Sequence, residues 1–215
     1  MRTATKRIVN VDDAAGTEVQ IRVCTFGGLT VYLNNSPVTI IWESQKARLL
    51  FCCLLVTFDQ WVHRQKIIEA VWPGCSPASG EKNFKTTLSR LRKSFSGPQN
   101  LIPVLTQGEA VRLNYASISL DASEFRNCST QGIKLLVRGE VKAARKSLEA
   151  AQDLYRGAFL PEEPHNQFIT AARVEFSDLY ASVIKALEKS YLLEGNSDAL
   201  EVLSFLKNGP LSEPS

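Results

Sequence analysis

Hydrophobic and polar residues alternate along the first patterned stretch of the chain. The alternation predicts strands over Gln20–Phe26, Leu29–Leu33 and Val38–Ile41, separated by turns at Gly27-Gly28 and Asn34–Pro37. Period-two patterning bounded by Gly, Asn, Ser and Pro is typical of strands joined by tight turns. We therefore expect the fold to begin with a small antiparallel sheet.

The pattern then changes to apolar positions spaced three and four residues apart, which indicates helices. Ser44 can cap a first helix that begins at Gln45. A second helix is predicted over Arg64–Val71 and ends at the Trp72–Gly74 breaker. His63 stands before this second helix, where Ser or Thr would form a stronger cap.

A third helix is predicted over Glu81–Phe95, after a loop at Cys75–Gly80. Its apolar face consists of Phe84, Leu88, Leu91 and Phe95. Its outward face is predicted to carry Lys82, Lys85, Thr86, Thr87, Ser89, Arg90, Arg92 and Lys93. A helix fixed by one face, with cations and short hydroxyls on the other, suits a DNA major groove. The alternative is an ordinary solvated basic helix.

Two further strands, Leu101–Leu105 and Ala110–Leu113, are predicted to form a hairpin around Gln107-Gly108. The order of sheet, helices and hairpin predicts an α+β fold, a winged helix-turn-helix with a small antiparallel sheet before it. The hairpin would be the wing. Its tip carries Glu109, which a DNA phosphate would repel, so insertion of the wing is less firmly predicted than docking of the third helix.

From Asp121 onward the chain reads as helical to its end. Asp121 and Glu124 have the spacing of a capping box before Phe125. The phrases Gly139–Ala144 and Gly195–Leu200 are similar, each with a Gly at a helix end and small residues in the next helix. This arrangement predicts an all-α domain of helical hairpins of the tetratricopeptide type.

Charge is divided unevenly between these two parts. Residues 21–120 hold eleven Lys and Arg against five Asp and Glu, a net charge of +6. Residues 121–215 hold eleven against fourteen, a net charge of −3. The first part therefore suits a polyanion and the second does not.

Composition excludes several classes of protein. The longest apolar run, Leu49–Val56, is far shorter than the ~20 residues of a membrane span, and no signal peptide is recognised, so we expect a cytoplasmic protein without membrane contact. Five unpaired cysteines and two histidines give no disulfide or metal pattern. Asp12-Asp13 lies in an unpatterned tail rather than in a phosphoreceiver domain. No catalytic motif is present, and we expect neither an enzyme nor a cofactor.

Three phrases in the first part, Lys46–Leu50, Ile67–Pro73 and Leu88–Lys93, resemble the OmpR-type effector domain of SARP-type bacterial transcriptional activators. In the second part, Leu154–Leu160 resembles a phrase of the bacterial transcriptional activator domain that follows the winged helix in that family. The resemblance implies an activator that binds double-stranded DNA at direct repeats in the bacterial nucleoid. It also implies that the helical repeats either hold a second protomer, as a homodimer, or contact RNA polymerase.

By this resemblance, base edges would be read by Thr86, Thr87 and Arg90. Phosphate contacts are expected from Lys46, Arg48, Lys82, Lys85, Arg92, Lys93 and Arg112. The expected divisions are a disordered tail at 1–19, a winged-helix domain at 20–118, a short activator domain at 121–207 and a tail at 208–215. The activator domain is shorter than expected, so a final helical hairpin is either missing or supplied by a partner.

Alternatives remain for several of these residues. Arg90 or Arg92 could pair internally with Glu69 or Glu81, and Lys46 and Arg48 could simply be solvated. The whole chain could instead be a protein-interaction module that modulates another regulator without binding DNA.

Overall fold

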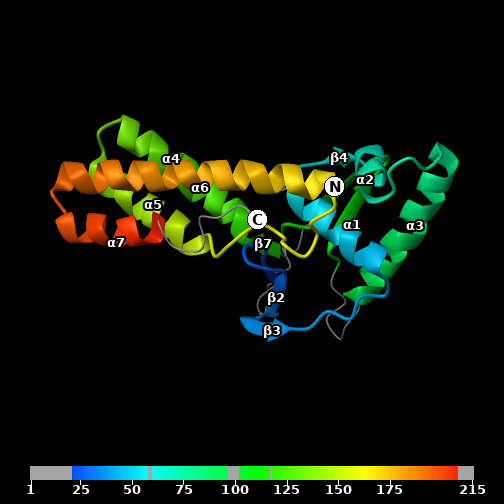
Figure 1. Cartoon of the computed structure of the whole chain (residues 1–215). Helices are drawn as coiled ribbons and strands as arrows, with labels where there is room; N and C mark the ends of the chain where they lie inside the picture. The colour runs from blue at the N-terminus through cyan, green and yellow to red at the C-terminus, as the bar shows by residue number, and fades with distance from the viewer. Residues whose placement is uncertain (1–20, 58–59, 96–101, 117, 208–215) are drawn as a thin grey trace, which may run out of the picture.

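The computed structural model describes residues 21–57, 60–95, 102–116 and 118–207, with side chains to residue 204. The predicted tails at 1–19 and 208–215, and Leu101 of the predicted wing, lie outside the described residues. A long helical body extends from one side of a mixed α and β unit (Figure 1). The predicted fold class is confirmed: a winged helix with a preceding sheet is followed by helical hairpins. In the described part of the chain, no helix has the length and apolar character that crossing a membrane requires.

The first sheet has the order β3-β2-β1-β7. Its strands are β1 (Ile21–Cys24), β2 (Thr30–Leu33), β3 (Ser36–Val38) and β7 (Ile118–Leu120). The prediction placed the third strand at Val38–Ile41, which is wrong: Asn34 and Asn35 both adopt positive φ and form a tight turn alone, so β3 starts directly after them. Strand β7, which was not predicted, pairs parallel to β1.

Helices α1 (Gln45–Val56) and α2 (Arg64–Val71) form as the sequence predicts. The Ser44 hydroxyl accepts a hydrogen bond from the Ala47 amide at 3.1 Å. The His63 ring replaces the usual Ser or Thr by accepting from the Gln65 amide at 3.3 Å. Helix α1 packs against α2, α3 (Pro77–Ser94), β6 (Ala110–Leu113) and α6 (Gln167–Glu194). Seven of its residues are buried as a result: Ala47, Leu50, Phe51, Cys52, Cys53, Leu54 and Leu55.

Helix α3 spans Pro77–Ser94, so the predicted loop at Cys75–Gly80 is wrong. Ser76 caps the helix and Pro77 occupies its first turn, a position that tolerates proline because the first amides of a helix have no partner inside it. Gly80 lies inside the helix and is buried against Ile68 of α2. Glycine usually signals a loop, but here it permits close approach of two helices.

The wing is the hairpin of β5 (Val104–Gln107) and β6 (Ala110–Leu113), with Gly108-Glu109 as its turn. Its first strand was predicted too early, at Leu101–Leu105. A short strand, β4 (Val62–His63), pairs with β6 and completes a second sheet of order β4-β6-β5. The wing is therefore joined to the start of α2.

The helical unit consists of α4 (Asp121–Val137), α5 (Val141–Leu154), α6 (Gln167–Glu194) and α7 (Ser197–Lys207). These form the two predicted hairpins, α4–α5 and α6–α7, whose connections contain Gly139 and Gly195 in the left-handed conformation. The predicted capping box is wrong. Asp121 is the first residue of α4 rather than its cap, and it is buried, with hydrogen bonds to Thr25 and Phe26 directly after β1.

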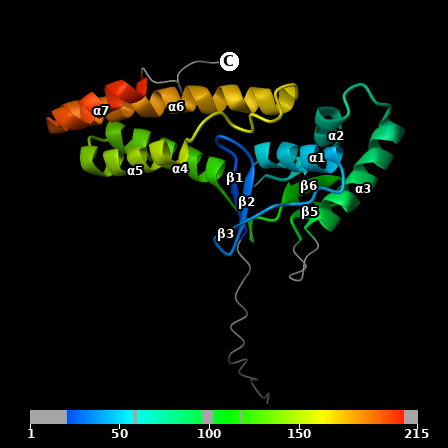
Figure 2. The same ribbon diagram turned by 60° about the horizontal axis from the view of Figure 1, so that its bottom comes forward.

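The two units share a continuous core. Phe26, just after β1, packs against Phe125 and Phe176 of the helical unit with ring centroids 5.2 and 5.3 Å apart. The segment after α5 also joins β1: the Leu160 amide donates to the Thr25 carbonyl at 2.9 Å. Helix α6 extends from the helical hairpins to α1, as both ribbon views show (Figures 1 and 2).

Candidate nucleic-acid interface

The inner face of α3 fixes this helix to the rest of the winged-helix unit. Phe84, Leu88 and Leu91 are buried, and Phe95 directly after the helix is buried as well, as predicted. The Phe95 ring lies 5.2 Å from Phe51 of α1 and 5.9 Å from Trp42. Because this face is held from one end of the helix to the other, the opposite face is presented in a fixed orientation.

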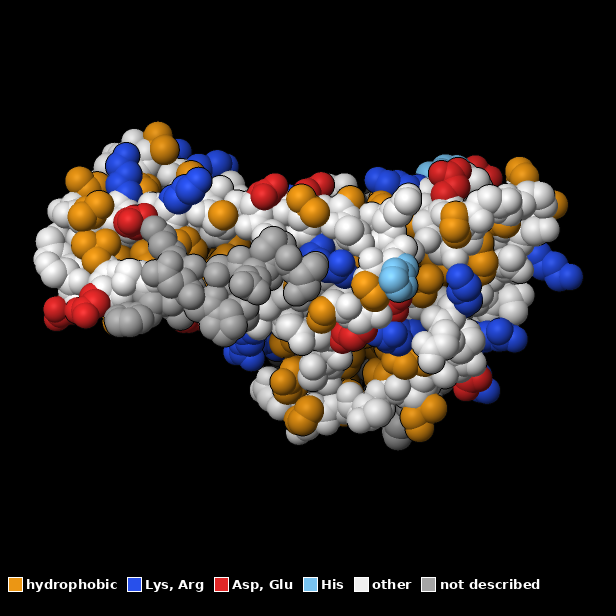
Figure 3. All heavy atoms as spheres, in the orientation of Figure 1, with side chains coloured by type: hydrophobic (Ala, Val, Ile, Leu, Met, Phe, Trp, Pro, Cys, Tyr) orange, Lys and Arg blue, Asp and Glu red, His pale blue; other side chains and the backbone are white. Residues whose placement is uncertain are grey.

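The opposite face of α3 is polar and positively charged. Lys82, Lys85, Thr86 and Arg90 are exposed. Within the described residues, none of the three cations forms an ion pair, because Glu81 pairs with Arg64 instead, at 2.8 Å. The Thr86 hydroxyl donates to the Lys82 carbonyl at 3.0 Å, which leaves its methyl group and its lone pairs accessible. Lys and Arg side chains stand along this end of the molecule in the space-filling view (Figure 3).

Thr87 does not belong to this face, and its predicted outward placement is wrong. Its exposed fraction is 5%. Thr87 lies three residues after Phe84 and four before Leu91, which is the spacing of the buried stripe. The sequence therefore indicated that Thr87 is buried, although its polar hydroxyl suggested an exposed position. Ser89, three residues after Thr86, is exposed. Its position fits a base-reading role, although it was not among the residues predicted to read bases.

The last cations of α3 are engaged by neighbouring elements. The Arg92 guanidinium donates to the Val104 carbonyl at 3.2 Å and to the Thr106 hydroxyl at 3.5 Å, and so connects α3 to the wing. Lys93 pairs with Glu43 at 3.0 Å, but its side chain remains 69% exposed. Among the described residues, neither Arg90 nor Arg92 pairs with Glu69 or Glu81, because Glu81 pairs with Arg64 and Glu69 accepts from the side-chain amide of Gln65. Lys93 stays available to a phosphate, whereas Arg92 mainly positions the wing.

The two cations predicted at the start of α1 have different environments. The Lys46 ammonium donates to the Val71 carbonyl at the end of α2, at 2.8 Å, and the residue stays exposed. Arg48 pairs with Glu163 of the helical unit at 2.9 Å, with both side chains largely covered. This pairing places Arg48 in the contact between the units and argues against its predicted role as a phosphate ligand.

The wing is held by ionic contacts that the sequence did not reveal. Glu109 at its tip pairs with the His63 ring at 2.9 Å and with Arg64 at 3.4 Å. The hydrogen bond from His63, its charge and the charge of Arg64 hold the pKa of Glu109 below its ordinary value. Glu109 therefore stays ionised, and the neighbouring His63 and Arg64 partly offset the negative charge that argued against wing insertion.

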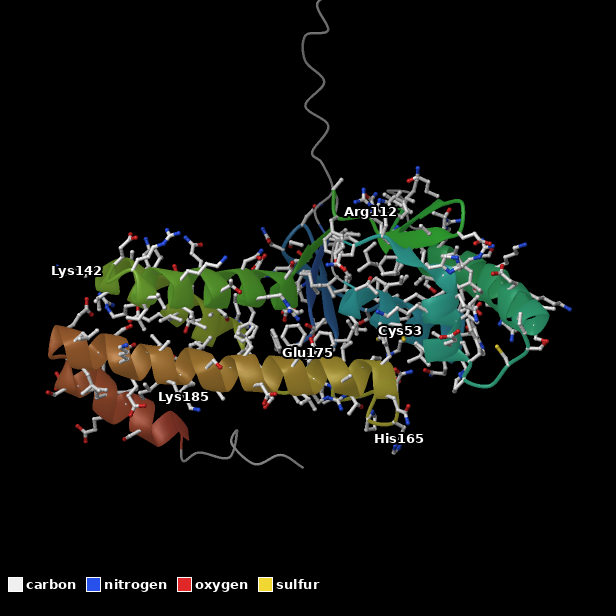
Figure 4. The ribbon with its side chains drawn as sticks, turned by 90° about the horizontal axis from the view of Figure 1, so that it is seen from above. Cys53, Arg112, Lys142, His165, Glu175 and Lys185 are labelled. Carbon is white, nitrogen blue, oxygen red and sulfur yellow. The ribbon has the colours of Figure 1, made fainter. Side chains whose placement is uncertain are left out.

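Arg64 is the positioning residue that sequence analysis missed. Its guanidinium contacts Glu81 of α3 and Glu109 of the wing, so one side chain connects α2, α3 and the hairpin. No local spacing predicts a contact between residues so far apart in sequence. Arg112 on β6 lies over the Trp61 ring, 4.7 Å from its centroid, on the wing side of the molecule (Figure 4).

Comparison with known proteins identifies a domain family and a similar solved structure. Residues 120–214 match the family model of the bacterial transcriptional activator domain. The structure is similar to Mycobacterium tuberculosis EmbR, solved in complex with a low-affinity phosphopeptide, with a TM-score of 0.69 and 20% sequence identity. That similarity covers 89% of this chain and 51% of the EmbR chain, so this chain spans about half the length of EmbR. No curated protein matches the sequence.

Proposed function

We propose that this chain, a SARP-type transcriptional regulator whose helical unit carries the bacterial transcriptional activator domain, binds double-stranded DNA sequence-specifically and activates transcription. The observation that supports this most directly is the exposed row of Lys82, Lys85, Thr86 and Arg90 on a helix whose other face is buried. The proposed role is one of binding, without catalysis or a cofactor, in the bacterial cytoplasm.

In the proposed complex, the outward face of α3 enters the major groove. An 18-residue helix is about 27 Å long at ~1.5 Å per residue, more than the ~12 Å width of that groove. Arg90 would donate its planar fork to a guanine, and the Thr86 methyl would contact a thymine. Lys82, Lys85 and Lys93 would contact phosphates, which position the protein without reading sequence.

The far end of the helical unit supports a protein contact in the same function. Val137, Leu192, Leu193 and Val202 are more than half exposed there. The end of an array of helical hairpins needs a polar cap to remain soluble alone. We propose that these side chains contact RNA polymerase or a second protomer bound at the adjacent repeat.

The test is fluorescence anisotropy with DNA from upstream of the protein's own gene, competed with random duplex and titrated with salt. About three to five phosphate contacts per protomer predict a slope of log K against log salt of about −3 to −5, with clear preference for the specific duplex. A duplex with scrambled repeats is the matched control.

If neither preference nor salt dependence is measured, the proposal of DNA binding is wrong. The exposed apolar end of the helical unit would then favour the second candidate, an interaction module that modulates another regulator. Co-purification with that regulator, lost on Leu192→Ser and retained in Lys85→Ala, would support this candidate.

A further inference from the structure

A small polar cavity lies where the winged-helix unit meets the helical unit. Its volume is about 220 Å³, and its lining residues are Arg22, Cys24, Tyr32, Asn35 and Arg156. Arg22 and Cys24 lie on β1, Tyr32 on β2 and Asn35 in the turn that follows. Arg156 comes from the segment after α5, so both units contribute to one cavity. Every lining side chain carries a polar atom or a sulfur.

The two arginines face this cavity without a carboxylate partner. Within the described residues, neither Arg22 nor Arg156 forms an ion pair. Both lie near the Cys24 sulfur: burial and the charge of Asp121 raise the pKa of this thiol, and the charges of Arg22 and Arg156 act in the opposite direction. Asp121 is the nearby acid, but its oxygens already accept hydrogen bonds from Thr25, Phe26 and Ala122. Two cations therefore stand against one carboxylate around Cys24, an excess of positive charge.

We propose that this cavity binds the phosphate group of a small phosphate monoester, held between Arg22 of the winged-helix unit and Arg156 of the helical unit. Guanidinium groups bind phosphate oxygens through paired hydrogen bonds, and a phosphate dianion matches two cations. The Tyr32 hydroxyl and the Asn35 amide can supply neutral donors. The volume lies below the ~300 Å³ at which pockets for larger organic ligands begin, so it suits a phosphate with a small substituent.

A phosphate held in this way would join the two units. It binds the folded arrangement, in which both arginines face one cavity, and not the unfolded chain. It must therefore stabilise the folded protein, and this stabilisation rises with the logarithm of the ligand concentration once that exceeds the dissociation constant. This expectation does not depend on DNA binding, because none of the lining residues belongs to α3 or to the wing.

Titration calorimetry of the full chain with inorganic phosphate and with phenyl phosphate tests the site. We expect one phenyl phosphate per chain, and at least about tenfold weaker binding in Arg22→Gln and in Arg156→Gln, since each removes a charge-assisted contact. Arg156→Lys retains the charge but loses the paired hydrogen bonds, so it should also bind more weakly than the native chain. Arg138→Gln, an exposed arginine at the far end of α4, is the matched control and should bind normally.

Alkylation of Cys24 gives an independent measurement, because its sulfur lines the cavity. Phenyl phosphate should slow iodoacetamide labelling of Cys24, followed by peptide mass spectrometry, in the native chain and in Arg138→Gln. It should not slow labelling in Arg156→Gln. Cys75 and Cys128, which lie elsewhere, should label at an unchanged rate.

Three outcomes would overturn the proposal: no phenyl phosphate binding at millimolar concentration, equal loss of binding in Arg138→Gln, or Cys24 labelling that is insensitive to the ligand. If duplex DNA displaces phenyl phosphate, the two arginines belong to the DNA-binding surface and the proposal is wrong. Much tighter binding of a phosphoserine peptide than of phenyl phosphate would assign the cavity to a protein partner. Circular dichroism of each variant confirms that loss of binding is not loss of fold.

Discussion

Asp121, the first residue of α4, accepts hydrogen bonds from the Thr25 amide at 2.7 Å and from the Thr25 hydroxyl at 2.6 Å. The Phe26 amide donates to the same carboxylate at 3.2 Å. The acid thus accepts from the backbone amides that follow β1, at the end of the β1–β7 ladder. The contact fixes the start of the helical unit to the winged-helix sheet.

Asp121→Asn should therefore destabilise the whole chain. The asparagine NH₂ group would face amide donors in a buried site, and loss of charge-assisted acceptance costs about 2–3 kcal/mol. Thr25→Val removes the hydroxyl donor alone and should cost about 1 kcal/mol. Urea unfolding measures both. Glu124→Gln, an exposed acid in the same helical turn, is the control, and an equal effect there would contradict this role of Asp121.

The contacts of Asp121 show which part of the fold could not be predicted from sequence. Local signals gave Ser44 as a cap and Phe84, Leu88 and Leu91 as the buried face of α3, and both predictions are confirmed. The resemblance of the second part of the chain to the bacterial transcriptional activator domain is also confirmed, by the match of residues 120–214. The local spacing at Asp121 wrongly predicted a helix cap. The partners of this carboxylate are Thr25 and Phe26, 96 and 95 residues away, and local spacing cannot reveal them.

The candidate site also has residues whose exposure the sequence predicts and contacts that it does not predict. Exposure of Lys85 and Arg90 follows from helical periodicity, and periodicity would also have buried Thr87. Arg48 pairs with Glu163 rather than facing DNA, and this pairing depends on how two distant segments pack, which spacing cannot reveal. The same holds for the contacts of Arg64 with Glu81 and Glu109.

Arg90→Ala and Lys85→Ala should affect DNA binding differently. Arg90→Ala should cost about 1–3 kcal/mol with the specific duplex and relax preference at one base pair. Lys85→Ala should weaken all duplexes about equally and reduce the salt slope by about one. Competition binding with single-base variants of the site separates the two results. Lys142→Ala, labelled at the opposite end of the molecule in Figure 4, is the control. The assignment of α3 to the groove is wrong if Arg90→Ala binds every duplex as the native chain does.

Gly80→Ala should destabilise the protein although alanine is the better helix former. A Cβ at this position would lie 2.6 Å from the Ile68 Cγ2 atom and 3.1 Å from the Cys75 sulfur. Overpacking of this kind costs about 1–3 kcal/mol, which exceeds the ~1 kcal/mol gained in helix propensity. Thermal unfolding measures the net effect. Ser89→Ala on the exposed face of the same helix should change stability by less than about 0.5 kcal/mol, and a stabilised Gly80→Ala would show that α2 and α3 do not pack this closely.

The Glu109 contacts should make the wing sensitive to acid. The pKa of Glu109 is lowered in the folded protein by His63 and Arg64, so its contribution to stability is present above the pKa of the unfolded chain. That contribution is lost as pH falls through the lower, folded pKa. The difference in stability between the native chain and Glu109→Gln should thus shrink on acidification below about pH 4.5, the ordinary value. A difference that grows on acidification would contradict the pairing. Glu69→Gln on α2 is the control, because the Glu69 carboxylate accepts a hydrogen bond from the neutral side-chain amide of Gln65.

Arg48→Met distinguishes a DNA contact from a contact between the two units. The Arg48–Glu163 pair is about four-fifths covered, so it is less screened than a surface pair. Its loss should destabilise the chain by about 1–2 kcal/mol, and a double-mutant cycle with Glu163→Gln should give a coupling energy of that order. If Arg48 serves this contact, the salt slope of DNA binding stays unchanged in Arg48→Met, whereas it falls in Lys85→Ala. A salt slope reduced by about one, with no coupling to Glu163, would instead place Arg48 on a phosphate and leave the two units joined by their shared core alone.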